Sequence, residues 1–475
     1  MSLLLSRKIL QGIGLLCFVL ALSYFLSNAI VMENLRLALV VTLLFFLATF
    51  CLRIVTGVTS LLIFLPFMAF LRRYVYVSNP YVKLDPILII SDALTIFMFS
   101  YIFLSKGEQL YKWFKENRLV RYTTFLLLIC VLQIFNPLQG GILVGLAGAK
   151  FWIVPMLWFY FGVYITERRM EIIFYLIITI GFVTAIYGLY QTFYGLTDFE
   201  KYWINYGGYT ALGIRGYVRP FSTFASAQEY TTFLMFSGII TVAYIVRRQS
   251  NLYLLLVLGI IFYALIIASA RGAILGFLIG SGLFLILGLR NPRKIVLAGI
   301  AIIIGFSVLT SQVSLPESPI EIEHSIKRTL IEHTTAGITD PFAESSTLWY
   351  RFQGVRDLSG RVIRNPLGYG IGVGTLGTFK FGGPGDATAP ETFFLIGCVM
   401  QVGLLGGILW ILIFYHFIKW NFVSYMKEND FFYRLEIAIS FVVVICGGFL
   451  LYSTAPIIWL LLGWGAKRLT NEKKD

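Results

Sequence analysis

Long apolar runs alternate with short polar segments along almost the whole chain. A helix that crosses a bilayer needs about 20 mostly apolar residues, so runs of this order predict about 14 membrane-spanning helices, within a range of about 12–14. The predicted spans are residues 9–27, 35–52, 54–71, 86–104, 123–135, 142–165, 172–190, 230–246, 252–268, 272–289, 295–309, 392–417, 435–451 and 455–464. The last two are short enough to form one bent helix instead. The sequence therefore predicts an all-α polytopic membrane protein.

Two polar segments, residues 191–229 and 311–391, are much longer than the others. The second predicts one large outward loop, and such long connections contain helices of their own. Within it, Ile322, Ile326 and Leu330 recur every four residues, which predicts a short interfacial helix. We therefore divide the chain into N-terminal membrane helices over residues 1–310, the loop over 311–391, and C-terminal membrane helices with a cytoplasmic tail over 392–475.

Composition agrees with a membrane protein and orients it. The 475 residues are 58% hydrophobic and 13% charged, with a mean hydropathy of +0.81, whereas soluble domains are about 45–50% apolar and about 25% charged. The net charge is +14. Lysine and arginine gather on cytoplasmic loops, so the basic predicted inward segments place both termini inside. These segments are residues 106–121, 166–171, 247–251, 290–294 and 419–434. Because the basic residues form no single patch, nucleic-acid binding is not expected.

Several cations are predicted on the outward side, against this bias. Arg271 lies in SARGA at the outer mouth of two spans, and Arg215 and Arg219 precede another span in GIRGYVRPFS. Lys150 lies within an apolar run, about 12 Å along its helix. Such side chains can extend to lipid headgroups. Alternatively they bind phosphate groups, and the arginine fork suits a diphosphate because it donates two hydrogen bonds at once.

The large loop carries further candidates. Glu391 ends it beside a proline, either as a helix-start charge favoured by the helix dipole or as a general base for an attacking hydroxyl. His324 and His333 are alternative bases or substrate contacts, and Arg351 and Arg356 are candidate substrate-binding residues. The five cysteines lie in apolar runs without a CxxC pattern, and no metal-ligand spacing surrounds the histidines. The sequence therefore predicts neither a metal site nor a bound cofactor.

One glycine pattern invites a different interpretation. Gly372, Gly374 and Gly377 fit GxGxxG. A dinucleotide-binding fold needs that motif between a strand and a helix of a βαβ unit, whereas here it follows NPLGYG in the outward loop. We interpret the glycines as a tight backbone turn that lets a sugar or phosphate come close.

The order of these segments resembles the O-antigen ligase and polymerase superfamily, which are membrane glycosyltransferases of the GT-C class. SARGA opens a span before the large loop, and RGYVRPFSTFASAQEYTTFL resembles the family segment in which an arginine precedes a small-residue turn. LWYRFQGVRDLSGRVIRNPLGYGIGVGTLG resembles the end of the family's loop, and QVGLLGGILW the helix that follows. The resemblance covers roughly the last 300 residues, the size of a large domain.

The resemblance implies a donor glycan carried on undecaprenyl diphosphate and a site on the outer face of the bacterial cytoplasmic membrane. Arg271 and Arg219 (or Arg215) would hold the diphosphate, and Lys150 would replace a family arginine. Ligases that attach O-antigen to lipid A-core usually have a His-Asn pair where this chain has Glu391 and Thr392. That departure favours a polymerase, which is expected to be inverting and metal-independent.

Two alternatives stay open. One is an O-antigen ligase or protein O-oligosaccharyltransferase of the same superfamily, and the other is a polysaccharide flippase or transporter. The expected partners are the lipid-linked glycan donor and acceptor and the membrane lipids, with chain-length regulator and flippase proteins as candidates; nucleic acid is not among them.

Overall fold

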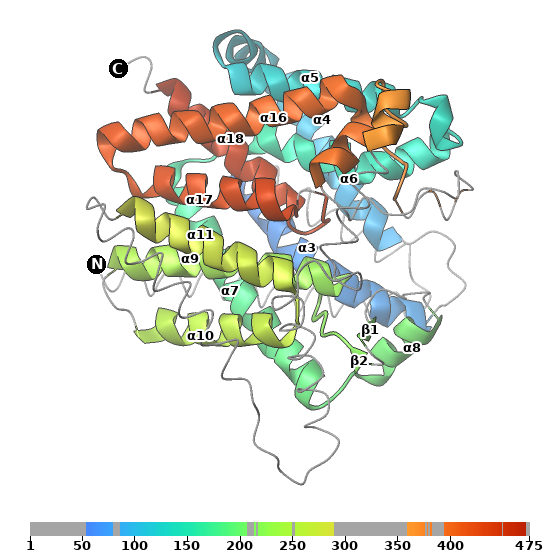
Figure 1. Ribbon diagram of the computed structural model, residues 1–475, viewed down its shortest axis with the longest axis vertical. Helices are drawn as coiled ribbons and strands as arrows, with labels where there is room; N and C mark the ends of the chain where they lie inside the picture. Colours follow the sequence, from blue (N-terminus) through green and yellow to red (C-terminus); the bar gives the residue numbers. More distant parts are fainter. Residues whose placement is uncertain are drawn as a thin grey trace. The chain divides into compact units, whose positions relative to one another are not determined.

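The computed structural model describes residues 54–78, 86–206, 213–214, 217–248, 252–288, 359–375, 378, 381, 394–448 and 450–471. These residues are mainly α-helical (Figure 1). The chain forms two compact units, each built from two separate stretches. Unit 1 comprises Met1–Met98 and Tyr164–Thr334, and unit 2 comprises Phe99–Val163 and Thr335–Asp475. The predicted division at residues 310 and 391 concerns membrane topology and stays a prediction.

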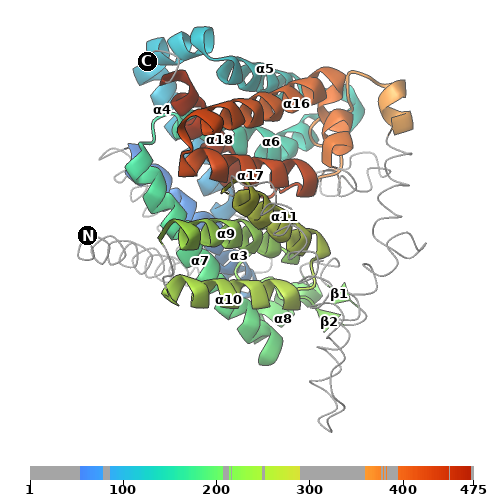
Figure 2. The ribbon, with the colours of Figure 1, turned by 60° about the vertical axis from the view of Figure 1, so that its left-hand side comes forward.

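Unit 1 is a set of helices around α9. Its described elements are α3 (Ile54–Ser78), the first part of α4 (Pro86–Glu116), α7 (Glu167–Phe193), α8 (Asp198–Tyr206), β1 (Gly213–Ile214), β2 (Tyr217–Val218), α9 (Ala227–Arg248), α10 (Leu252–Ile267) and α11 (Arg271–Gly288). Helix α9 lies against α7, α10 and α11, and Figures 1 and 2 show these helices side by side. Gly181 of α7 faces Ser237 of α9, whose Oγ donates to the Ile177 carbonyl at 3.2 Å. Such small-residue contacts let membrane helices approach closely.

Unit 2 is organised around α6. Its described elements are the rest of α4, α5 (Arg118–Gln133), the 3₁₀ turn η1 (Pro137–Gln139), α6 (Ile142–Gly162), α16 (Phe394–Glu428), α17 (Phe431–Cys446) and α18 (Ala455–Asn471). Helix α6 packs along α18. Gly162 of α6 meets the carbonyl of Leu460, and Gly463 of α18 meets the carbonyl of Phe159, so there is no room for a Cβ at either glycine. The backbones of α6 and α18 are therefore in close contact, with one glycine contributed by each helix.

The prediction of a mainly helical chain is confirmed for the described residues, apart from the short strands β1 and β2 and the turns of the connecting segments. Six helices in the described residues are long and apolar enough to cross a membrane. Helices α17 and α18 are separate, which excludes one bent helix over residues 435–464. The predicted spans 9–27, 35–52 and 295–309 lie outside the described residues, as does most of the loop 311–391. The count of about 14 spans and the large loop stay predictions.

Two predicted inward segments are mostly helical, and their inward orientation stays a prediction. Residues 106–121 belong to the end of α4 and the start of α5, and residues 419–434 to the end of α16 and the start of α17. Lysine, arginine and glutamate are good helix formers in water, so these helices continue beyond their apolar parts. The break between α4 and α5 and the break between α16 and α17 are each followed by a side-chain N-cap. The Asn117 side chain accepts a hydrogen bond from Leu119 N at 2.8 Å, and Asp430 accepts one from Phe432 N at 3.2 Å.

Candidate functional site

Two of the predicted arginines, Arg219 and Arg271, belong to unit 1. Arg271 is the first residue of α11, and Arg219 lies in the segment that leads into α9. Both side chains are partly buried, and the charge of Arg219 acts on the Arg271 guanidinium. Like charges held near each other repel, and an anion between them removes that repulsion. The pair is therefore a candidate anion site.

The backbone next to each arginine has an uncommon conformation. Ser222, three residues after Arg219, has φ 51°, and Ser269, two residues before Arg271, has φ 53°. Both serines are buried. Residues other than glycine rarely adopt positive φ, and those that do cluster at active sites and ligand clamps. A positive φ close in sequence to each arginine supports a functional interpretation of both segments.

Short local structures fix the segment on both sides of Ser222. Strands β1 and β2 pair antiparallel, with Gly213 opposite Val218, and β2 ends one residue before Arg219. At the other end, Glu229 N donates to Ser226 Oγ at 3.1 Å, and Ala225 N donates to Glu229 Oε2 at 3.1 Å. This resembles a capping box at the start of α9. Glu229 therefore acts as a helix-start carboxylate.

Lys150, the third described candidate, belongs to unit 2. It is partly buried in α6, and its Nζ lies 4.4 Å from the centroid of the Tyr452 ring, a cation–π contact. Two residues earlier, Gly148 meets the backbone of Ile371, and the Gln139 Oε1 accepts from Gly372 N at 3.2 Å. The glycine-rich segment therefore rests on the same helix that carries Lys150.

The glycine-rich segment also fills a break in α16. Gly403 interrupts that helix with φ 78° and ψ 175°. Tyr369 N donates to Met400 O at 2.8 Å, Gly370 N donates to Gln401 O at 3.1 Å, and Leu404 N donates to Pro366 O at 2.8 Å. Backbone groups inside a membrane protein need internal partners, and these three bonds supply them at the interruption.

A side-chain bridge holds the same segment in place. Gln401 Nε2 donates to Val373 O at 2.7 Å, and Gln401 Oε1 accepts from Trp152 Nε1 at 2.6 Å. Gly370 and Gly374 have φ of 103° and 73°, and residues 371–374 form turns. The interpretation of the GxGxxG pattern as a tight backbone turn is confirmed for the residues that are described.

The remaining predicted site residues cannot be placed. Glu391, Arg215, Arg351, Arg356, His324 and His333 lie outside the described residues, so their roles stay predictions. Among the residues that the structure describes, no group of three or more His, Cys, Asp and Glu side chains is arranged to hold a metal ion. The expected metal independence also stays a prediction.

Sequence reasoning missed a residue beside the arginine pair. Arg73 of α3 is 1% exposed and donates to the Ser222 carbonyl at 2.6 Å and the Phe224 carbonyl at 3.1 Å. A signal was present, because Arg72 and Arg73 follow an apolar run on the predicted outward side, against the positive-inside bias. Nothing in the sequence, however, indicates which carbonyls Arg73 would bind.

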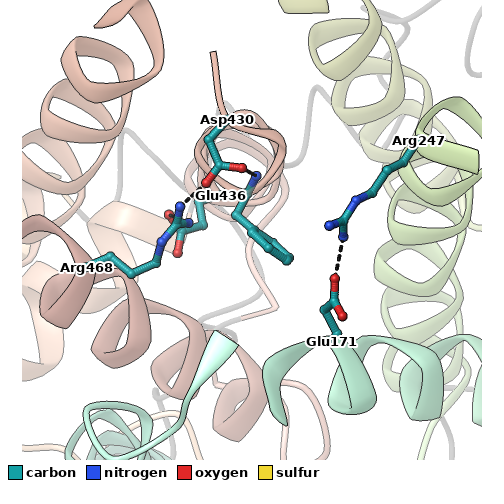
Figure 3. Close-up of polar contacts among 6 residues, drawn as sticks. Glu171, Arg247, Asp430, Glu436 and Arg468 are labelled. Carbon is teal, nitrogen blue, oxygen red and sulfur yellow. Dashed lines mark hydrogen bonds and ion pairs between the residues drawn. The ribbon is translucent and has the colours of Figure 1, made fainter. Parts of the chain in front are cut away.

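A separate charged cluster lies in unit 2. Arg468 of α18 forms an ion pair with Asp430, and its Nη1 lies 3.7 Å from Oε2 of the fully buried Glu436 (Figure 3). Its guanidinium carbon also lies 4.0 Å from the Tyr433 ring centroid. In unit 1, Arg247 pairs with Glu171 at 2.7 Å and both side chains are partly exposed (Figure 3). The predicted topology puts both charge clusters on the cytoplasmic side.

In comparisons with known proteins, the chain matches no family model, no curated protein sequence and no solved structure. The resemblance to the O-antigen ligase and polymerase superfamily thus rests on the sequence motifs alone.

Proposed function

We propose that this protein is a membrane glycosyltransferase that polymerises oligosaccharide repeat units carried on undecaprenyl diphosphate, at the outer face of the bacterial cytoplasmic membrane. The observation that carries the proposal is that unit 1 holds two partly buried arginines at the edges of apolar helices, Arg271 at the start of α11 and Arg219 in the segment before α9. Cations at a membrane edge are costly unless they bind something. A diphosphate headgroup is an anion of the right charge, and the lipid tail would keep it at that depth.

The chemistry follows from the charge that develops during transfer. The acceptor hydroxyl oxygen forms a bond to the donor sugar C1, while the bond from C1 to the diphosphate oxygen breaks. The diphosphate leaves with additional negative charge, which Arg219 and Arg271 stabilise because their positive charges are fixed before the reaction. Glu391 accepts the hydroxyl proton. One direct displacement inverts the configuration at C1.

Lys150 is proposed as a further contact to the substrate. An ionisable residue within a membrane helix is a functional candidate by default, and the backbone of the glycine-rich segment lies against the same helix. Exposed backbone beside a cation is suited to phosphate or to sugar hydroxyl groups.

The test is turnover of a synthetic undecaprenyl-diphosphate repeat unit by purified protein without any other acceptor. We expect a ladder of products. A charged hydrogen bond is worth about 1.5–3 kcal/mol, so removing both guanidinium groups should slow the reaction about 10²–10⁴-fold. Arg219→Lys and Arg271→Lys should recover part of the rate, since lysine keeps the charge without the fork.

Arg247→Ala is the matched control, because it removes an arginine from the exposed ion pair with Glu171. Its ladder should equal that of the wild type. Full ladder formation by folded Arg219→Ala and Arg271→Ala proteins would remove these residues from the reaction.

The interruption of α16 supports a second candidate, translocation of the lipid-linked glycan. Discontinuous membrane helices commonly surround the substrate in transporters. Proteoliposomes that contain a fluorescent lipid-linked glycan separate the two activities. Movement between leaflets with an intact diphosphate bond would favour the flippase, whereas transfer to a separate acceptor without self-polymerisation would favour the ligase alternative.

A further inference from the structure

Arg73 lies at the centre of a buried network that fixes the segment after Arg219. Its two terminal nitrogens donate to the carbonyls of Ser222 and Phe224 at 2.6 and 3.1 Å. Its guanidinium carbon lies 4.4 Å from the centroid of the Phe221 ring. The Arg73 side chain therefore binds two carbonyls and contacts one ring, all within residues 221–224.

Gln191 of α7 binds the backbone N–H groups of the same segment. Its Oε1 accepts from Phe221 N at 3.1 Å and from Ser222 N at 2.7 Å. Its Nε2 donates to Glu200 Oε1 at 2.7 Å, and also reaches Ser222 O at 3.4 Å. The backbone of Ser222 is thus bonded at both its N–H and its C=O by side chains from two different helices.

Glu200 of α8 anchors the network. This carboxylate is fully buried, and it accepts hydrogen bonds from Tyr187 at 3.0 Å and from the Thr197 hydroxyl at 2.8 Å. Buried charges are stable only where they are paired and hydrogen-bonded. Here a buried arginine and a buried glutamate are joined through Ser222 O and Gln191, so each stabilises the other through a shared chain of polar groups.

The network explains how Ser222 keeps its positive φ. A residue in that conformation persists only where its surroundings determine it strongly. Ser222 has its N–H, its carbonyl and its hydroxyl all bonded, the last to Thr184 O at 2.7 Å. This turn begins three residues after Arg219, with only Pro220 and Phe221 between them. Its conformation therefore fixes the backbone from which the Arg219 side chain extends.

We propose that Arg73 is a positioning residue of the anion site, which holds the turn at Ser222 and so fixes the backbone from which the Arg219 side chain extends. This inference rests on the proposed function for its substrate, a lipid-linked diphosphate. Arg73 acts through the backbone of residues 222–224, whereas Arg219 and Arg271 contact the diphosphate themselves.

The test uses Arg73→Lys in the full-length protein, with binding of inorganic diphosphate and ladder formation as separate measurements. Lysine keeps the positive charge but cannot chelate two carbonyls. A displacement of about 1 Å costs on the order of 10²-fold in rate, so we expect that loss in ladder formation together with weaker diphosphate binding. Arg72→Lys is the matched control, since Arg72 precedes it and lies over the Trp203 ring at 5.8 Å; it should match the wild type.

The decisive measurement is made in the Arg219→Ala background. If Arg73 acts through Arg219, adding Arg73→Lys there changes diphosphate binding less than about threefold, because the two effects are coupled. Equal losses with and without Arg219 would mean a general structural role and overturn the inference. A folded Arg73→Lys protein with wild-type binding and rate would do the same.

Two further outcomes separate this inference from the proposed function. Diphosphate binding that depends on Arg73 only when Arg219 is present supports the inference even where no ladder forms, and that result sinks the polymerase proposal alone. Wild-type protein without Arg219-dependent diphosphate binding overturns both. Should Arg73→Lys fail to fold, Gln191→Met removes the bonds to Phe221 N and Ser222 N with little change in size, and the same dependence on Arg219 is expected.

Discussion

The interruption of α16 depends on one glycine, and Gly403→Ala tests that dependence. Gly403 has φ 78°, where an L residue is strained. A Cβ at this position would lie 2.6 Å from the Leu367 carbonyl oxygen and 2.8 Å from the Pro366 oxygen. Both atoms belong to backbone, so relief requires the segment at residues 366–370 to move away from the helix.

The cost can be worked from these contacts. Strain at positive φ for a residue other than glycine is about 1–3 kcal/mol. If the segment moves, up to three bonds weaken, those from Tyr369 N, Gly370 N and Leu404 N, each worth about 0.5–1.5 kcal/mol net. If all three bonds are lost, we therefore expect the free energy of unfolding to fall by about 2.5–7.5 kcal/mol.

The assay is unfolding in mixed micelles of increasing SDS fraction, followed by tryptophan fluorescence. Trp152 bonds to Gln401 and lies close to the interruption, so its signal should change first. Gly259→Ala in α10 is the control, because a Cβ there meets nothing within 4 Å and alanine is about 1 kcal/mol better than glycine in a helix. A Gly403→Ala protein that unfolds at the same SDS fraction as the wild type would refute this account.

Three further predictions concern other parts of the chain. Arg468→Met leaves the carboxylates of Asp430 and Glu436 without their cation, so the free energy of unfolding should fall by about 3–5 kcal/mol in the same SDS titration. Adding Glu436→Gln should recover part of this loss. No recovery would show that Glu436 does not depend on Arg468. Asn117→Leu removes the cap of α5 and the bond to the Ala466 carbonyl at 2.8 Å, so a loss of about 0.5–2 kcal/mol is expected, whereas unchanged unfolding would mean that water replaces the cap. Glu391→Gln should slow ladder formation about 10²–10⁴-fold while diphosphate binding is kept; normal ladders would show that Glu391 is a helix-start charge.

Much of the helical layout could be predicted from the apolar runs, because a membrane-spanning helix needs a continuous apolar stretch of sequence. The starts of α6 and α10 agree with the predicted spans to the residue. The interruption at Gly403 could not be predicted, since VGLLGG reads as an ordinary apolar stretch. The interruption is accompanied by backbone hydrogen bonds to residues 366–370. Backbone hydrogen bonds produce no periodic pattern in the sequence.

The candidate site shows the same limit. Arg219 and Arg271 were found because charge on the outward side is unusual in itself. The structure adds that they act on each other. Arg73 was passed over because its partners are main-chain carbonyls, which every residue has. A buried cation that binds backbone can be recognised only once the fold has brought the two segments together.

The close contact between α6 and α18 has a consequence for how the protein is made. Helix α6 fits against α18 through glycines that face backbone, and α18 belongs to the stretch of unit 2 that is synthesised last. Roughly 290 residues separate Gly162 from Ala455, which at about 5–20 residues per second takes roughly 15–60 s. During that interval Gly162 of α6 cannot pack against α18, which has not yet been synthesised. Unit 1, whose second stretch lies between them in the sequence, is completed first. The ribosome therefore completes the arginine-bearing unit before it has synthesised the helix that packs along α6.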